Sequence, residues 1–263
     1  MPSVPLGQLQ QEAAHLSDHF TDPQAYLKQL ERLLLTYSTP THRHGRIKGL
    51  RPVIFSFEVP PPVLKRLELE MALQASQQPA AALAVADALW ERRSFETRQL
   101  AIRMLGVTPA PAAEVTARLE AWAAENQEEL LVTELYQRGP RNLVQQHAAT
   151  LIDFAQRLLA TNENRKQVLG LGCLQTLLTT GDFPNLPSLF TLLMQFCEDP
   201  PRKLQPFLAD LLSTLAQRSP KETAYFLSQL LAAQPSEGAR WVSRQTLRQL
   251  PAEMQPSLRE LAK

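Results

Sequence analysis

Apolar residues recur along most of this chain at steps of three and four, the spacing of one face of an α-helix. The segment LQPFLADLLSTLAQ shows the pattern most clearly, with one stripe made of Leu204, Phe207, Leu208, Leu211, Leu212 and Leu215. Pro and Gly residues separate one stripe from the next. We predict helices over about 6–19, 23–37, 61–77, 79–92, 94–105, 110–124, 127–138, 140–160, 163–180, 184–197, 201–217, 220–233, 236–249 and 252–262.

Local signals mark several of the helix ends. Ser219, Pro220 and Glu222 form the pattern of a capping box with proline in the first turn. Gly181 follows the stripe of ENRKQVLGLGCLQTLLTTG, and we expect it to end that helix in the left-handed conformation. The glycines of GLGCLQ, residues 170–175, lie inside the same helix, where we expect them to allow close helix packing.

The spacing of the predicted helices indicates a repeat architecture. From about residue 61 they fall into pairs about 35–45 residues apart, the range of HEAT-type repeats, and their short joins favour antiparallel pairing. We therefore predict an all-α fold, a right-handed α-solenoid of HEAT-like antiparallel helix pairs, with an irregular helical bundle as the alternative. The predicted parts are an N-terminal helical pair (1–37), a basic loop containing Pro and Gly (38–60) and the helical repeats (61–263), forming one continuous domain over 1–263.

Composition agrees with a helical globular protein. Hydrophobic residues make up 44% and charged residues 20%, a balance that excludes wholesale disorder. The one strand-like stretch is PVIFSFEV, residues 52–59. Cys173 and Cys197 form no metal or disulfide pattern, so we expect buried thiols in a reducing cytoplasm. The sequence shows no signal-peptide pattern and no apolar run of bilayer length, so we expect a cytoplasmic protein without membrane contact.

A formal net charge of +1 gives no global attraction to nucleic acid, so any preference for anions depends on where the cations lie. The loop carries the densest basic run, with no acid inside it: Arg43, Arg46, Lys48 and Arg51, together with two histidines. An extended cationic strip of this kind is able to follow a phosphate backbone, while a solvated connector is the alternative.

A second cluster lies near the C-terminus. Arg240, Arg244 and Arg248 follow at steps of four, which places them on one helical face. Like charges at this spacing repel, so the face needs either an anion or acidic neighbours such as Glu237 and Glu253. Both alternatives remain open at this stage.

Other cations recur close to predicted helix starts. They are Arg98, Arg141, Arg165, Lys166, Arg202 and Lys203. Equivalent positions of stacked repeats share one face, so these residues are candidates for a positive track reinforced by helix N-termini. Arg98 lies in SFETRQLAIRML, residues 94–105, where the alternative is the solvated side of a packed helix.

Sequence signals for catalysis are few. The chain has no Gly-rich phosphate loop, no zinc-type spacing and no nucleophile elbow. Asp153 stands beside Phe154, a pair that is common in ordinary helices. We predict no catalytic residue, no metal site and no cofactor.

Two segments resemble AlkD-like DNA alkylation repair proteins. The first is ALWERRSFETRQLAIRML, residues 88–105, where Trp90, Phe95, Ala101 and Leu105 match the pattern of a Trp near a helix end followed by an aromatic-led helix. The second is DPPRKLQPFLADLLSTLAQRSPKETAYFLSQL, residues 199–230, which is similar to a late repeat of that family. The resemblance implies HEAT-like repeats around a cationic concave groove for duplex DNA. In active members a carboxylate and tryptophans stand near the lesion, where the carboxylate stabilises the sugar cation as the glycosidic bond breaks.

The chain departs from the pattern of the active members. ENQEELLVTELYQRGPRNLVQQ, residues 125–146, has neither Trp nor Asp, and its nearest chemical substitutes are Glu129, Glu134 and Tyr136. Leu211 and Leu212 stand where a lesion-stacking aromatic is expected. We therefore predict a noncatalytic AlkD-like protein that binds duplex DNA. One alternative is a HEAT-repeat scaffold for a protein partner, and another is a glycosylase for alkylated purines.

Overall fold

The computed structural model describes residues 6–38, 53–126, 128–181, 183, 185–232 and 234–262. Residues 39–52, which include Arg43, Arg46, Lys48 and Arg51, lie outside this description. The chain divides into two compact units, residues 1–143 and 144–263.

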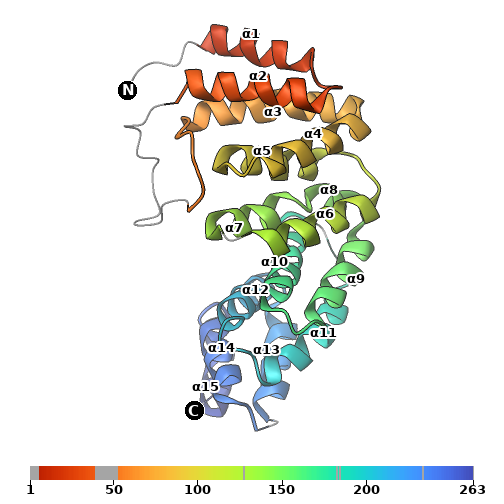
Figure 1. The fold of residues 1–263 in the computed structure, drawn as a ribbon. Coiled ribbons are helices and arrows are strands. Elements are labelled where there is room, and N and C mark those ends of the chain that lie inside the picture. The colour runs from red at the N-terminus through yellow and green to blue at the C-terminus, as the bar shows by residue number, and fades with distance from the viewer. Residues whose placement is uncertain are drawn as a thin grey trace. The chain divides into compact units, whose positions relative to one another are not determined.

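The described residues form helices and no strands, which confirms the all-α prediction (Figure 1). The N-terminal unit contains α1 (Leu6–Ser17), α2 (Pro23–Thr36), α3 (Pro61–Gln77), α4 (Pro79–Glu91), α5 (Phe95–Val107), α6 (Ala112–Glu125) and α7 (Glu129–Arg138). Helix α8 (Arg141–Gln146) includes the boundary between the units. The C-terminal unit contains α9 (Ala148–Leu159), α10 (Asn164–Thr180), α11 (Leu186–Glu198), α12 (Gln205–Arg218), α13 (Pro220–Ala232), α14 (Glu237–Leu247), the 3-10 turn η1 (Ala252–Met254) and α15 (Gln255–Leu261).

Side-chain caps and prolines fix several helix starts. Oδ1 of Asp22 accepts hydrogen bonds from two backbone N–H groups of α2, and Ser94 and Ser236 cap α5 and α14 through their hydroxyl groups. These side chains satisfy N–H groups that have no partner inside the helix. At α13 the carbonyl of Ser219 accepts the first helical hydrogen bond, from the N–H of Thr223 at 3.0 Å.

Two predicted details of the helices are wrong. The helix expected over 140–160 breaks at His147, whose φ of −141° is not helical, so that α8 and α9 are separate helices. The break falls in an exposed polar run, residues 145–147, where no buried apolar side chain holds a continuous helix. Gly181 is extended, with φ −104° and ψ 151°, and is not left-handed. Glycine is needed there for space, because a Cβ would lie 2.8 Å from both the Leu177 carbonyl oxygen and Cγ1 of Val144.

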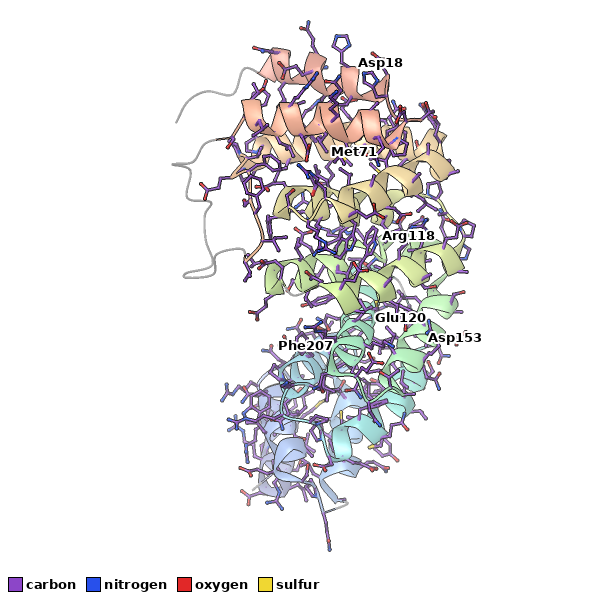
Figure 2. The ribbon with its side chains drawn as sticks, viewed as in Figure 1. Asp18, Met71, Arg118, Glu120, Asp153 and Phe207 are labelled. Atoms are coloured by element: carbon purple, nitrogen blue, oxygen red, sulfur yellow. The ribbon has the colours of Figure 1, made fainter. Side chains whose placement is uncertain are left out.

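In the N-terminal unit several helices pack on the helix two positions later in the chain, and consecutive helices such as α4 and α5 also pack on each other. Helix α1 contacts α3, α3 contacts α5 and α5 contacts α7, while α2 contacts α4. Arg118 of α6, labelled in Figure 2, links to α4 by donating from Nε and Nη2 to the two carboxylate oxygens of Asp87, at 2.9 and 2.8 Å. The alternation of neighbours is the arrangement expected of stacked helix pairs.

The strand-like segment before α3 is held in place without forming a strand. Ser56 Oγ and the Phe57 N–H both donate to the buried carboxylate of Glu96, at 2.7 and 2.9 Å. The Val53 N–H donates to Glu128, and Phe57 and Val59 are buried. The described part of the predicted loop is thus an ordered segment fixed against the starts of α5 and α7.

In the C-terminal unit α10, α12 and α14 run parallel in one layer. At their starts, a Cβ on Gly238 of α14 would lie 2.7 Å from Nε2 of Gln205 in α12. In the middle, Gln175 of α10 donates to Thr214 of α12 at 2.7 Å. At their ends, Gln217 of α12 donates to Gln249 just after α14. The starts of α12 and α14 are therefore neighbours.

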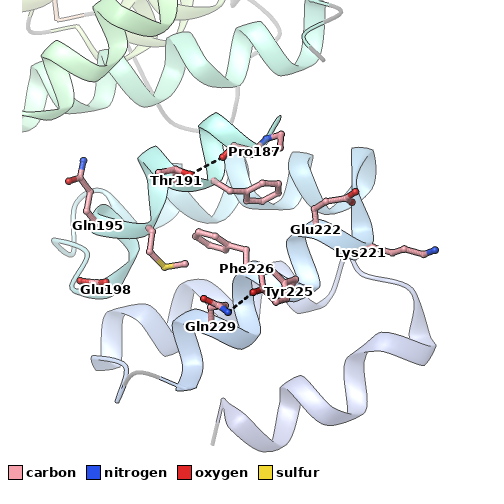
Figure 3. A pocket seen from close by; sticks show the side chains of 11 residues that line it. Pro187, Thr191, Gln195, Glu198, Lys221, Glu222, Tyr225, Phe226 and Gln229 are labelled. Carbon is pink, nitrogen blue, oxygen red and sulfur yellow. Dashed lines mark hydrogen bonds between the residues drawn. The ribbon is translucent and has the colours of Figure 1, made fainter. Parts of the chain in front are cut away.

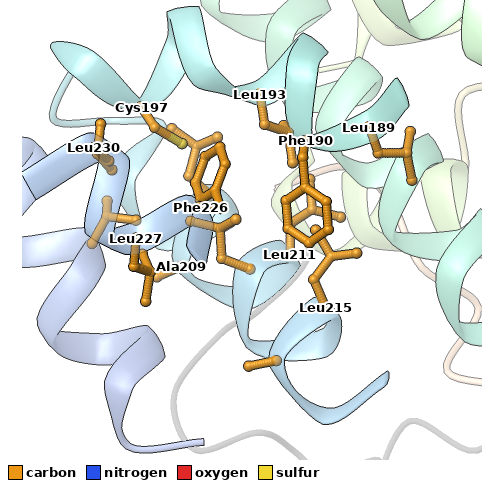
Figure 4. Packing of buried hydrophobic residues seen from close by; sticks show 14 of the residues in the cluster. Leu189, Phe190, Leu193, Cys197, Ala209, Leu211, Leu215, Phe226, Leu227 and Leu230 are labelled. Carbon is orange, nitrogen blue, oxygen red and sulfur yellow. The ribbon is translucent and has the colours of Figure 1, made fainter. Parts of the chain in front are cut away.

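Helix α13 contacts both α11 and α15, and helices α9 to α15 all contribute to one hydrophobic core, part of which Figure 4 shows. Phe190 of α11 and Phe226 of α13 meet in this core with ring centroids 5.4 Å apart. Gly170 lets α10 approach α9, because a Cβ there would lie 3.0 Å from the Ala155 carbonyl oxygen. Among the described residues no helix combines the length and apolar character needed to cross a bilayer.

Candidate nucleic-acid interface

The first candidate cations stand directly before α12. Pro201 to Leu204 form a turn closed by the hydrogen bond from the Leu204 N–H to the Pro201 carbonyl at 2.7 Å. Leu204 is buried and anchors the turn, while Arg202 and Lys203 are exposed. Neither cation forms an ion pair with a carboxylate of the described residues. The turn thus presents two positive charges next to the N-terminus of α12, where the helix dipole also favours an anion.

The sequence left open whether acidic neighbours neutralise Arg240, Arg244 and Arg248, and among the described residues they do not. Arg244 and Arg248 are exposed and Arg240 is half-buried. Within the described part of the chain, none of the three pairs with Glu237, Glu253 or another carboxylate. Nε of Arg240 is buried without a hydrogen-bond partner. With Arg202 and Lys203, these arginines make up what we call the α12–α14 cation set.

The basic pair at the start of α10 has a different environment. Arg165 is exposed, and Lys166 lies 2.8 Å from Oε1 of Glu163 in an ion pair. Because α10 lies parallel to α12 in the same layer, its start belongs to the same end of the unit. The charge of Lys166 is partly neutralised by Glu163. This pair therefore attracts an anion less strongly than the α12–α14 cation set does.

Arg98 lies in the interior of the N-terminal unit. Its side chain is 5% exposed, and its guanidinium carbon lies 4.3 Å from the centroid of the Trp90 ring. Nε donates to the Trp90 carbonyl at 3.2 Å, and the Trp90 ring stacks on the Trp122 ring with centroids 4.7 Å apart. Burial, followed by the charge of Arg93, lowers the pKa of Arg98. The segment SFETRQLAIRML is therefore neither a groove rim nor a solvated face at this position, and Arg98 has no access to a phosphate.

Arg141 belongs to a partly buried cluster of mixed charge. It stands at the start of α8, is half-buried, and its Nε has no hydrogen-bond partner. Burial lowers its pKa, as does the charge of Arg138, while Glu68 and Glu134 act in the opposite direction. The nearby acids neutralise part of its charge, which distinguishes Arg141 from the α12–α14 cation set.

Glu134, one of the chemical substitutes that the sequence offers beside Glu129 and Tyr136, is enclosed by neighbouring side chains. Its Oε1 accepts from Gln99 Nε2 at 2.8 Å and from Arg103 Nη2 at 3.0 Å, and Arg103 also binds Glu68 at 3.0 Å. Its Oε2 lies 4.0 Å from Nε of Arg138 and is shielded from solvent. A sugar cation would have to displace this network to reach the carboxylate.

Asp153 and the two cysteines also lack the surroundings of a catalytic residue. Asp153 is exposed while Phe154 is buried, so the two side chains do not form a joint site (Figure 2). Cys173 and Cys197 are buried, and burial raises the pKa of each thiol to about 12, which keeps both protonated and unreactive. Over the ranges that the structure describes, no group of His, Cys, Asp and Glu is arranged to hold a metal ion.

An apolar cavity between α11 and α13 was not predicted from the sequence. Its volume is about 760 Å³, and its walls include Phe190, Met194 and Phe226, with Tyr225 67% exposed at the opening (Figure 3). Gln229 donates to the Tyr225 hydroxyl at 2.8 Å. These side chains continue the apolar stripes of their helices, so the sequence pattern alone does not distinguish them from core residues.

A family profile described as DNA alkylation repair enzyme matches residues 56–250. No curated protein and no solved structure matched the chain. The profile covers both segments that resemble AlkD-like proteins, residues 88–105 and 199–230, and it extends from the ordered segment before α3 to the end of α14. The match over most of the chain, together with its all-helical fold, shows that the chain belongs to the DNA alkylation repair enzyme family.

Proposed function

We propose that this protein is a noncatalytic member of its family that binds duplex DNA through the α12–α14 cation set. The proposal includes the right-handed, HEAT-like arrangement of the helix pairs, with cations on a concave face. Contacts from the basic segment at Arg43, Arg46, Lys48 and Arg51 and from Arg165 and Lys166 belong to the same proposal. Arg98 is left out because it is buried, and Arg141 is secondary because acids surround it.

The observation that supports the proposal most is the absence of carboxylate partners for the α12–α14 cation set within the described residues. Other arginines of this chain, such as Arg103 and Arg118, form ion pairs with acids from neighbouring helices. Unpaired cations beside a helix N-terminus attract phosphate groups, since their charge and the helix dipole act together. Family membership makes DNA the phosphate polymer to test first.

Charge reversal tests this proposal. Arg202→Glu with Lys203→Glu should weaken binding to a fluorescent duplex at least about tenfold in low salt, because two phosphate contacts are lost and two repulsions are gained. The matched control is Lys28→Glu with Lys221→Glu, which alters the net charge equally at exposed positions of α2 and α13. Equal weakening by both double variants would show that only net charge matters. Unchanged binding in the first variant would contradict the proposed surface.

The noncatalytic part of the proposal is supported by the shielded carboxylate of Glu134 and by the lack of Trp and Asp in residues 125–146. We expect no release of 7-methylguanine from alkylated duplex DNA above the rate without protein. Release that disappears in Glu134→Gln or in Glu129→Gln would establish the glycosylase alternative and identify its carboxylate. Glu129 is included because it is exposed in the first turn of α7.

The apolar cavity between α11 and α13 supports a second candidate function, a scaffold for a protein partner. A groove of this size lined by Phe, Tyr and Met side chains is typical of surfaces that accept an apolar side chain or helix. Capture of a partner that persists at high salt and is lost in Met194→Glu would favour the scaffold. If Met194→Glu still captures the partner, the partner does not bind at this cavity.

A further inference from the structure

A cavity near the end of α14 is surrounded by three arginines from two helices. Its walls include Arg244 and Arg248 of the α14 segment, Arg259 of α15, and the buried Leu247 and Ala262. The volume is about 390 Å³, within the range of about 300–1,000 Å³ that small-molecule sites occupy. The two helices contact each other, so their packing brings Arg259 next to arginines that precede it by more than ten residues.

No carboxylate of the described residues lines this cavity or pairs with its arginines. Nη1 of Arg244 donates to the Ala262 carbonyl at 3.3 Å, and Nη2 of Arg259 donates to Oε1 of Gln255 at 2.6 Å. A guanidinium has five N–H donors, so each of these arginines keeps donors for a ligand. The negative end of the α14 dipole favours a cation such as Arg248, which follows the last helical residue. Arg259, in the last turn of α15, is favoured in the same way, so the dipoles explain a cation at each helix end but not the convergence of three guanidiniums on one cavity.

We propose that this cavity binds a phosphate monoester group. Guanidinium groups bind phosphate oxygens through paired, charge-assisted hydrogen bonds, and a monoester carries between about one and a half and two negative charges near pH 7. A cavity with three guanidiniums, and no carboxylate among the described residues that line it, balances the charge of a phosphate monoester better than that of a singly charged phosphodiester. The volume leaves space for part of the molecule that carries the phosphate.

Two sources of this group fit the same chemistry. One is the 5′-phosphate at a DNA end, and this source rests on the proposed function. The other is a free phosphate compound, which does not depend on DNA binding. Experiments with inorganic phosphate and with DNA ends distinguish the two.

The first experiment is calorimetric titration of the full chain with inorganic phosphate. We expect saturable binding that Arg259→Gln and Arg248→Gln each weaken about tenfold, which corresponds to about 1.4 kcal/mol. Arg32→Gln is the matched control, because it removes one exposed arginine of α2 outside the cavity and outside the α12–α14 cation set, and it should bind phosphate as the unmodified chain does. Both cavity arginines are exposed, so the variants should fold, and their thermal unfolding checks this.

The second experiment compares one short duplex carrying either a 5′-phosphate or a 5′-hydroxyl. If the source is a DNA end, the phosphate should raise affinity about tenfold, and Arg259→Gln should remove the difference while Arg32→Gln preserves it. Binding of inorganic phosphate that depends on Arg259, with no preference between the duplexes, assigns the cavity to a free phosphate compound.

The proposal is overturned if phosphate binding is absent and the two duplexes bind equally, or if Arg32→Gln weakens phosphate binding as much as the cavity variants. Loss of duplex affinity in the Arg202→Glu, Lys203→Glu variant reports on the proposed function separately. Each of the two proposals is therefore able to fail without the other.

Discussion

Gly106 in α5 is the position where the packing of the N-terminal unit leaves least space. A Cβ added there would lie 1.9 Å from the Arg138 carbonyl oxygen and 2.9 Å from the Arg138 carbonyl carbon. Both atoms are backbone at the end of α7, so no side chain is able to move away by changing rotamer. The contact brings α5 against α7, the two helices that carry Arg103 and Glu134.

We predict that Gly106→Ala destabilises the chain by about 2 kcal/mol or more. Alanine would gain about 1 kcal/mol from its higher helix propensity, but overpacking typically costs about 1–3 kcal/mol and exceeds that range where backbone has to shift. At 1.9 Å the overlap is severe, so the steric term should exceed the propensity gain. The loss should appear as a lower urea midpoint when unfolding is followed by circular dichroism.

Gly7→Ala provides the control for this prediction. Gly7 lies in α1, and a Cβ there would have no atom within 4 Å, so alanine should leave stability unchanged or raise it. If Gly106→Ala is as stable as Gly7→Ala, the close approach of α5 to α7 is not a feature of the folded protein.

Two further predictions concern the C-terminal unit. Arg218→Met should lower the free energy of unfolding by about 2 kcal/mol, because Arg218 donates at 3.0–3.2 Å to three backbone carbonyls at and after the end of α10. The control Arg202→Met should lower it by less than about 0.5 kcal/mol, and urea titration measures both variants. Burial raises the pKa of Cys173 and Cys197 to about 12, so above pH 9 the unfolded thiols ionise while the folded ones stay protonated, and stability falls with rising pH. The free energy of unfolding should fall by about 1.4 kcal/mol per thiol and pH unit between about pH 9 and 12. Changing both cysteines to alanine should remove this dependence on pH. An unchanged dependence in that variant would assign it to other groups.

The sequence predicted the helices well because each one carries a stripe of buried apolar residues. The stripe from Leu204 to Leu215 lies in α12 as expected, although the helix begins at Gln205 because the preceding residues form a turn. The break at His147 was not predictable in the same way. It depends on which apolar residues on each side find neighbours in the core, and that is decided by tertiary packing.

The candidate site was less predictable, because the role of an arginine depends on neighbours distant in the chain. Arg98 looked like a surface cation, yet it is buried over the ring of Trp90, and that ring stacks on Trp122 from a helix that follows. Arg202 stayed exposed for a local reason, since the buried Leu204 anchors its turn. Arg259 carried no signal in the sequence, because only the contact of α15 with α14 brings it to the cavity.

The most direct test of the central claim is the dependence of duplex affinity on salt. If the α12–α14 cation set replaces counterions on phosphates, the logarithm of the association constant should fall with the logarithm of the salt concentration with a slope of about −2 or steeper, since each phosphate contact contributes about −0.9. Arg202→Glu with Lys203→Glu should make the slope shallower by about 1.8. A flat dependence on salt, or no duplex binding even in low salt, would contradict the account.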